Sequence, residues 1–318
     1  MILREREIAA STENVRVFIW KAFTEWKPVL EGMFGDVLIP EVEAEARKAN
    51  VKYGDDQDAF EELTGCSIDS MVTPDKISEF RQTYSHVRVY HGCRPEDISS
   101  YKEKGLLVRD KSVQIERFRK NFLTGKFPEL TEEMLQHSIE KLQPNTDKDE
   151  EWEVVFDDRI LTEYCGQYHE YGSEYLGNLV SNLPIENKEP YRSELRKSGK
   201  PTTLKINLPN TSDYLSDSTI EVIIRDMLAG WLWCVANSET EAHTWWLDLS
   251  HEKPLPPEHI CGHKVYNEET GEYEENSEIE EKHENQRQLT EEEKVEAMRL
   301  AKIALKTGQI STPPQNPE

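Results

Sequence analysis

A short alternating segment carries the residues best suited to chemistry. Residues 87–94 read VRVYHGCR, in which apolar and polar side chains alternate with the period of two that is typical of a half-buried strand. His91 can donate, accept or bind a proton near neutral pH. Gly92 has no Cβ, which lets a ligand approach the main chain closely. The pattern predicts a ligand site where this strand ends.

A second segment is rich in aromatic residues and glycine. Residues 164–179 read YCGQYHEYGSEYLGNL, with four tyrosines, one histidine and three glycines. Aromatic rings beside flexible glycines can stack a flat heterocycle while backbone groups reach its polar edge. The alternative is a tyrosine-rich helix start that packs through its rings, and the residues leave both interpretations open.

Short strands and helices must position these two segments. A helix over 98–104 is expected to end at Gly105. A long helix over 220–235 has apolar residues at helical spacing, and Ser216–Ser218 supply its cap. Strands are predicted over 106–108, 152–156, 202–209, 243–249 and from about 255 to 266.

The first eighty residues are predicted to be helical. Apolar residues from Val15 to Trp26 recur at helical spacing, and Pro28 follows the expected end of that helix. Further helices are expected over 40–49, 58–63 and 74–84. A helical insertion is expected at about 110–150, with one helix capped by Thr131.

Composition limits the class of protein. The chain has 318 residues, of which 31% are charged and 36% apolar, and no apolar run is long enough to span a bilayer. No secretory peptide is evident at its start, and its five cysteines form no CxxC pair, so a reduced, cytoplasmic protein without membrane contact is expected. The net charge of −24 argues against a broad electrostatic grip on nucleic acid.

The acidity is concentrated near the end of the chain. Residues 265–293 are rich in glutamate, with few apolar residues, and are expected to form a solvated or disordered linker. Thr290 and Glu293 form a capping box for one amphipathic helix that ends at Gly308. That helix either packs back on the body or meets a partner, and the acidic linker suits a basic partner.

Two motifs resemble the ADP-ribosyltransferase superfamily, which includes poly-ADP-ribose polymerases and mono-ADP-ribosylating toxins. YHGCR followed by Y..KGLL resembles its first strand and helix, and GSEYL, residues 172–176, is similar to its Gly-x-x-Tyr-Phe segment. The resemblance implies that His91 hydrogen-bonds an NAD ribose, that the Gly92 backbone clasps the nicotinamide carboxamide, and that Tyr175, or Tyr171 in its place, stacks on nicotinamide. Cys93 stands where the family has a hydroxyl residue, and Arg94 joins the nucleotide-binding set.

The family places a catalytic glutamate on a late strand, where it bonds a ribose hydroxyl. Helical spacing puts Glu221 on the flank of a helix, so it is not the first choice. Glu258, in a Pro-Pro-Glu turn similar to the family's closing strand, is the candidate, and a solvent-facing turn glutamate is the alternative.

His259-x-Cys261-x-His263 could form a metal site, because residues two apart on a strand share one face and His251 lies near in sequence. Structural zinc more often uses CxxC pairs. A partly buried edge strand is therefore the preferred interpretation, and no metal is predicted.

These inferences predict an α+β fold: a helical region over 1–83, a split β-sheet ADP-ribosyltransferase-like core over 84–264, and an acidic linker with a C-terminal helix over 265–318. The resemblance implies an NAD-dependent ADP-ribosyltransferase with NAD as substrate and a protein or nucleic-acid acceptor. A toxin or antiviral role is compatible with that chemistry.

Two alternatives stay open: an RNA 2′-phosphotransferase-like enzyme that uses Arg88 and Arg94, and a non-catalytic nucleotide-binding or partner-binding protein. Every version depends on His91 and Gly92 facing an aromatic ring of residues 164–179 across one nucleotide-sized cleft.

Overall fold

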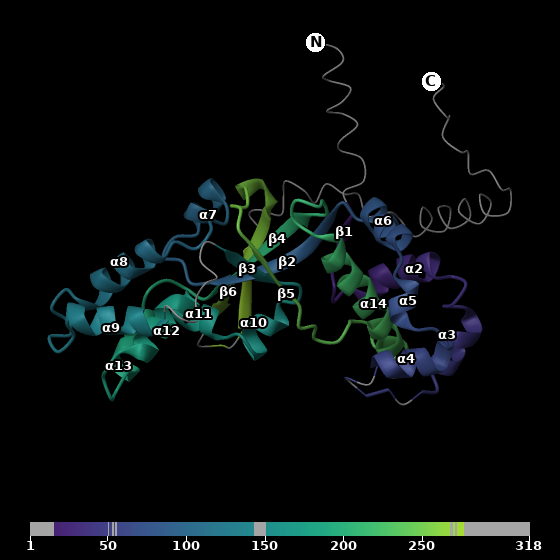
Figure 1. Ribbon diagram of the computed structural model, residues 1–318, viewed down its shortest axis with the longest axis horizontal. Helices are drawn as coiled ribbons and strands as arrows, with labels where there is room; N and C mark the ends of the chain where they lie inside the picture. The colour runs from purple at the N-terminus through teal and green to yellow at the C-terminus, as the bar shows by residue number, and fades with distance from the viewer. Residues whose placement is uncertain are drawn as a thin grey trace, which may run out of the picture. The chain divides into compact units, whose positions relative to one another are not determined.

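The long central strand of the fold is the segment that carries His91. In the computed structural model, which describes residues 16–49, 51–52, 54, 56–142, 151–267, 270 and 272–276, this strand is β2, His86–Cys93. Val87 and Val89 are fully buried, as the alternating pattern predicts. The described residues form a mixed α+β fold, with helices around one sheet (Figure 1).

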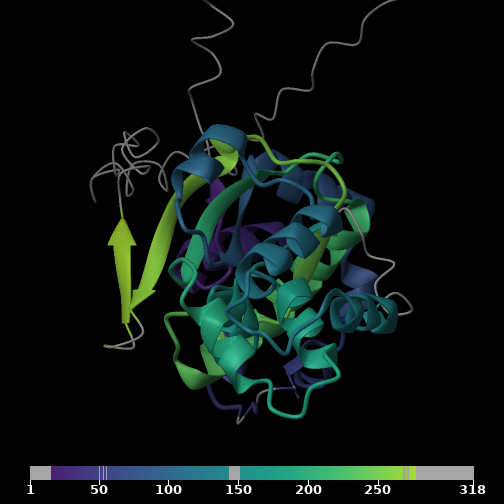
Figure 2. The same cartoon turned by 90° about the vertical axis from the view of Figure 1, so that its left-hand side faces the viewer.

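The sheet has the strand order β5-β3-β2-β4-β6-β7, with β1 paired to β2 outside this path. The other strands are β1 Val17–Phe18, β3 Trp152–Val155, β4 Thr202–Pro209, β5 Asp248–His251, β6 Ile260–Asn267 and β7 Glu272–Asn276. Figure 2 shows β7 as the outer strand beside β6.

Strand β2 is paired very differently on its two sides. Against β4 it is antiparallel over its whole length, from His86↔Pro209 to Cys93↔Thr202. On the other side, β1 runs parallel to its first two residues, and β3 meets it in register at Tyr90↔Val155. The end of β2 that carries His91 and Gly92 is therefore held by β4 and has room on its β3 side.

One group of helices packs with the sheet in the larger of two hydrophobic clusters. Helix α14, Asp217–Asn237, contacts each of the N-terminal helices α2 Phe23–Met33, α3 Pro40–Ala46, α4 Asp56–Thr64, α5 Ile68–Met71 and α6 Pro74–Thr83. Its Ser216 cap accepts a hydrogen bond from the Thr219 amide, as predicted. This cluster, the larger core, also contains the buried valines of β2.

A second group of helices has its own smaller cluster. It is built from α8 Lys111–Phe122, α9 Glu132–Leu142, α12 Glu174–Asn182 and α13 Glu189–Arg196. Figure 1 shows this group on the other side of the strands from α14. Helices α8 and α9 occupy the predicted insertion, and Thr131 accepts a hydrogen bond from the Met134 amide, as expected of a cap.

Other short elements connect these groups. Helices α7 Ser99–Lys104, α10 Arg159–Glu163 and α11 Gln167–Tyr171 lie between strands, and a 3₁₀ turn, η2, covers Pro257–His259. The predicted helix that ends at Gly105, the strands over 152–156 and 202–209, and the last strand before residue 266 are confirmed.

Three sequence predictions are wrong. The segment predicted as a helix from Val15 to Trp26 forms β1 and then α2, which starts at Phe23 and continues through Pro28. Phe18 and Trp20 are both buried, because this segment adds to the sheet before it enters the helix. Apolar spacing alone did not separate these two roles.

The strand predicted over 106–108 is reduced to one bridge, Leu106↔Leu255. The strand predicted over 243–249 starts only at Asp248. Before it, the Trp245 amide donates to Asp157 Oδ2 at 3.1 Å, so a carboxylate takes the hydrogen bond that a neighbouring strand would accept.

Among the described helices, none combines the length and apolar character needed to cross a bilayer. The predicted acidic linker reaches the described residues only in part, and the predicted helix after Thr290 lies outside them.

Candidate active site

A cavity of about 240 Å³ lies beside the end of β2, on the side where β3 pairs with it. Strands β2, β3 and β5 line it together with α10, α11 and the start of α12. His91 and Gly92 line it together with Tyr168, an aromatic residue of the segment 164–179. Other lining side chains that can ionise, hydrogen-bond or stack on a ligand include Glu153, Cys165, Gln167, Glu174, Trp246 and Asp248.

The orientation of His91 is fixed by one hydrogen bond. Its Nδ1 lies 2.7 Å from the backbone oxygen of Glu153. A carbonyl oxygen only accepts, so Nδ1 must carry the proton. Burial lowers the pKa of His91, which keeps the ring neutral near pH 7 and leaves Nε2 as a hydrogen-bond acceptor. Histidine is therefore presented to the cavity as an acceptor or base.

Gly92 is required by close packing of the chain itself. A Cβ at this position would lie 2.9 Å from Tyr168 Cβ and 3.0 Å from Leu161 Cδ2. The close approach that the sequence predicts for a ligand is thus made by α10 and α11, which cross the end of the strand. The backbone of Gly92 still borders the cavity.

Tyr168 joins two carboxylates. Its hydroxyl donates to Glu153 Oε2 at 2.7 Å and lies 3.3 Å from Glu174 Oε2. The phenol has one proton, so the shorter contact is the stronger donor bond. The two carboxylate oxygens are no farther apart than the sum of these distances. Burial, and then the bond to Glu153, raise the pKa of Tyr168, so the phenol stays protonated.

The turn between α11 and α12 positions Glu174. Helix α11 ends at Gly172, which has a left-handed backbone with φ of 72°. Ser173 then caps α12 by accepting from the Leu176 amide. Glu174 is therefore the first residue of α12, and its carboxylate lies beside the Tyr168 hydroxyl.

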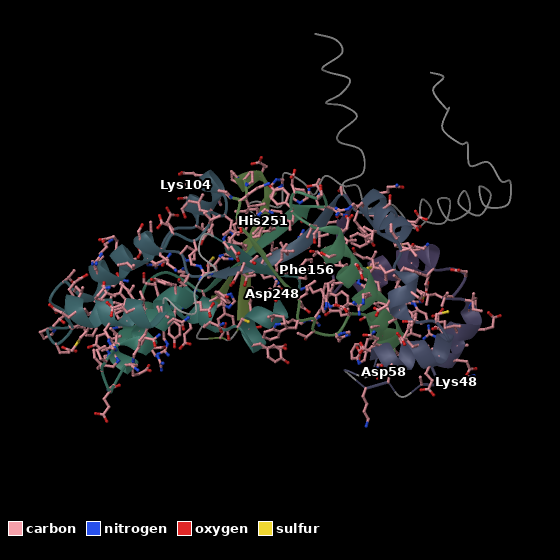
Figure 3. The ribbon with its side chains drawn as sticks, viewed as in Figure 1. Lys48, Asp58, Lys104, Phe156, Asp248 and His251 are labelled. Atoms are coloured by element: carbon pink, nitrogen blue, oxygen red, sulfur yellow. The ribbon has the colours of Figure 1, made fainter. Side chains whose placement is uncertain are left out.

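A third carboxylate completes the acidic side of the cavity. Asp248, exposed at the start of β5 and labelled in Figure 3, lines it with Glu153 and Glu174. Burial first, and then the charges of all three carboxylates, raise the pKa of the Cys165 thiol. The thiol is thus kept protonated, which makes Cys165 a poor nucleophile.

An exposed aromatic pair lies at the mouth of the cavity. Trp246 lines the cavity but is 56% exposed, and Tyr164 is 60% exposed. Their ring centroids lie 5.2 Å apart in an edge-to-face arrangement. Such rings offer a flat, apolar face to a ligand that enters from solvent.

The remaining residues of the predicted site do not line this cavity. Tyr175 is buried in the smaller cluster, and the Tyr171 ring packs against Gly177 and beneath the Arg196 guanidinium. Glu258 is exposed on η2. The structure thus brings together His91 and Gly92 but none of the other four predicted residues.

Arg94, the fourth of these residues, is buried within the protein. Its guanidinium donates to the backbone oxygens of His169 at 2.8 Å, Ser198 at 3.2 Å and Arg196. Arg88 in turn donates to the Asn207 side chain at 2.8 Å. Both arginines hold parts of the fold together.

Within the described residues, no group of three histidine, cysteine, aspartate or glutamate side chains is placed to hold a metal ion. In the His259-x-Cys261-x-His263 pattern, the Cys261 thiol donates to the Lys205 carbonyl oxygen.

Sequence reasoning missed the acidic residues of the cavity. Glu153 had a usable signal, because Trp152 and Val154 are buried on one side of β3 and Glu153 alternates with them. Glu174 lies within the tyrosine-rich segment 164–179, whose acidic residue was not considered. Trp246 and Asp248 had no signal, since packing of distant segments brings them to the cavity.

No protein-family model, curated protein or solved structure matches this chain.

Proposed function

We propose that this cavity cleaves the bond between nicotinamide and ribose in NAD and passes the ADP-ribose to a macromolecular acceptor. The observation that carries the proposal is the joint lining of one cavity by a neutral histidine and by two glutamates that share the Tyr168 hydroxyl. The identity of the substrate, NAD, is proposed from the motif resemblance around His91.

The chemistry needs few groups. As the glycosidic bond breaks, its electron pair goes to the ring nitrogen and the ribose becomes cation-like. Carboxylates stabilise such oxocarbenium-like states, and one carboxylate can accept the proton of the attacking nucleophile. Glu153 and Glu174 are placed close enough to share these tasks. Positioning of the reactants supplies much of the remaining rate.

The neutral ring of His91 suits the role of holding the ribose. Its Nε2 accepts, so it can take a hydrogen bond from a ribose hydroxyl while Nδ1 stays bound to the Glu153 backbone. Tyr168 takes the position beside the nicotinamide that the motif resemblance implies for Tyr175. The Gly92 backbone keeps its proposed contact with the carboxamide.

The size of the cavity limits how NAD is held. Small-molecule pockets usually enclose about 300–1,000 Å³, and this cavity is smaller. We therefore assign the nicotinamide and its ribose to the cavity and the rest of NAD to the surface beyond Trp246.

The phosphotransfer alternative has less support. It requires cationic side chains for a phosphate, and the two arginines that it would use, Arg88 and Arg94, donate their hydrogen bonds to protein acceptors. The acidic lining of the cavity also opposes a phosphate.

The test is release of nicotinamide from NAD by the full chain, measured by chromatography. His91→Ala and Glu153→Gln are each expected to lower the rate at least about 100-fold, the usual size of a positioned acid–base or charge-stabilising group. Glu163→Gln is the matched control, because Glu163 is exposed at the end of α10 and does not line the cavity. Absence of release by folded wild-type protein would overturn the proposal.

One further variant decides which glutamate acts. Glu258→Gln abolishes release if the glutamate implied by the motif resemblance is catalytic, and Glu153→Gln or Glu174→Gln does so if the cavity carboxylates are. Full activity of both cavity variants together with loss in Glu258→Gln would move the chemistry away from this cavity.

A further inference from the structure

The cavity has an unusual balance of charge. Three carboxylates line it, from Glu153, Glu174 and Asp248, whereas none of the residues that line it within the described chain is lysine or arginine. Its histidine is neutral near pH 7, because burial lowers the pKa of His91. Among the ion pairs of the described residues, Arg109 is the partner of one of these carboxylates: its Nη2 lies 3.8 Å from Glu153 Oε1. One arginine at the edge leaves the lining with a net negative charge.

The three carboxylates line the same cavity, and two of them meet at one hydroxyl. Glu153 and Glu174 both contact the Tyr168 hydroxyl, and Asp248 acts with them on Cys165. Like charges gathered along the walls of one cavity create a stronger local potential than the same charges spread over an open surface.

The walls of the cavity add aromatic rings to this charge. Tyr168, on α11, and Trp246, shortly before β5, line it from two segments that are far apart in the sequence. Aromatic faces attract cations, and a flat cation can also stack on them. The His91 Nε2 has no partner among the described hydrogen bonds and offers one acceptor to a donor on the ligand.

From this combination we infer that the cavity selects a positively charged aromatic ring over a neutral ring of the same shape. The inference rests on the proposed function for the identity of the ring, nicotinamide.

Charge selection also explains how a product would leave. When the glycosidic bond breaks, the bonding electrons neutralise the nicotinamide ring and the positive charge moves to the ribose. The attraction between the ring and the three carboxylates ends with that step. The same carboxylates then face the cation-like ribose, so one set of charges first holds the substrate and then stabilises what forms from it.

The probes are N1-methylnicotinamide, a permanent cation, and nicotinamide, its neutral analogue. We expect the wild-type protein to bind the cation roughly tenfold more tightly, measured by ligand-observed NMR titration. The ratio should fall as salt rises, because part of the attraction reaches through solvent. Equal affinity, tighter binding of nicotinamide, or no binding of the cation would each overturn the inference.

Variants locate the effect. Asp248→Asn and Trp246→Leu are each expected to lower the preference for the cation about threefold while leaving nicotinamide binding within twofold. Glu163→Gln removes an exposed carboxylate outside the cavity and should leave the ratio unchanged. An equal effect of Glu163→Gln and Asp248→Asn would reduce the preference to the overall charge of the protein and overturn the inference.

The outcomes separate this inference from the proposed function. Preference for the cation without nicotinamide release keeps the charge selection and removes the proposed reaction. Nicotinamide release together with equal affinity for the two probes does the reverse.

Discussion

The two hydrophobic clusters give the cavity different kinds of support. The larger core joins α14 and the N-terminal helices to the sheet, and the strands of this sheet carry His91 and Glu153. The smaller cluster is built from helices and the loops that join them, with no strand among its residues, and its α12 carries Glu174. Residues on the sheet are held by paired strands, whereas Glu174 is held by side-chain packing. The site therefore has two walls: a sheet wall held by paired strands, and a helical wall held by the smaller cluster. We call the boundary between these walls the seam.

The largest effect is expected from the larger core. Trp231 is fully buried there, and its Nε1 donates to Glu31 Oε1 at 3.0 Å. Trp231→Ala should lower the free energy of unfolding by about 3–5 kcal/mol, since it leaves a large cavity. Urea unfolding followed by circular dichroism measures this. Leu107→Ala is the control, because Leu107 is 53% exposed, and it should cost less than about 0.5 kcal/mol.

A substitution in the smaller cluster tests whether that cluster opens by itself. Leu179 is fully buried between α12 and its neighbours. Leu179→Ala should cost about 3 kcal/mol, and hydrogen exchange should become faster in α9 and α12 while α14 stays protected. Equal acceleration in α14 would show that the two clusters unfold as one unit and would remove the comparison.

The larger core also contains a carboxyl group sensitive to pH. Burial raises the pKa of Asp226, on α14, to about 6, although the Trp245 indole donates to it at 2.5 Å. The folded state then holds this proton more tightly than the unfolded chain, whose aspartate titrates near 3.9. Its contribution to stability is therefore fully present below about pH 4 and is lost as the pH rises to about 6.

Asp226→Asn removes this titration and keeps an oxygen for the indole. Relative to the wild type, it should be more stable by roughly 2–3 kcal/mol at pH 7 and nearly equal at pH 4. Urea unfolding at the two pH values measures the difference. A constant difference between the two proteins at both values would contradict the raised pKa.

The seam itself is tested at Gly92. Gly92→Ala places a Cβ against Tyr168 and Leu161 and should cost about 1–3 kcal/mol, the usual range for overpacking. It should also slow nicotinamide release, because Tyr168 must move away from the glutamates. Gly166→Ala is the matched control, since a Cβ there meets nothing within 4 Å. A similar loss in both variants would remove the packing argument.

Local patterns predicted the elements of the fold better than the site. Strand β4 and helix α14 follow from an alternating run and a long helical run, because each pattern is long enough to exclude the other structure. The segment before Trp26 failed because its short apolar run suits a strand and a helix equally well. The strand predicted over 243–249 was wrong at Trp245, because its backbone N–H donates to the Asp157 carboxylate. The sequence does not reveal this hydrogen bond.

The site was predicted only where it is local. His91 and Gly92 are adjacent, so one segment revealed both. Tyr168 and Tyr175 lie in the same segment, and only packing decides which faces the cavity: α12 turns Tyr175 into the smaller cluster, and Glu174, one residue earlier, reaches the cavity instead. The carboxylates come from three separate segments, whose meeting depends on the whole fold.

Arg94 has a mechanical consequence for this site. It follows β2 directly, and its guanidinium reaches three backbone oxygens at α11 and around the end of α13. Arg94 thus connects α11, which also carries Tyr168, and the end of α13 to the strand that carries His91. The wall that holds the tyrosine and the wall that holds the imidazole are therefore joined by one buried guanidinium as well as by packing.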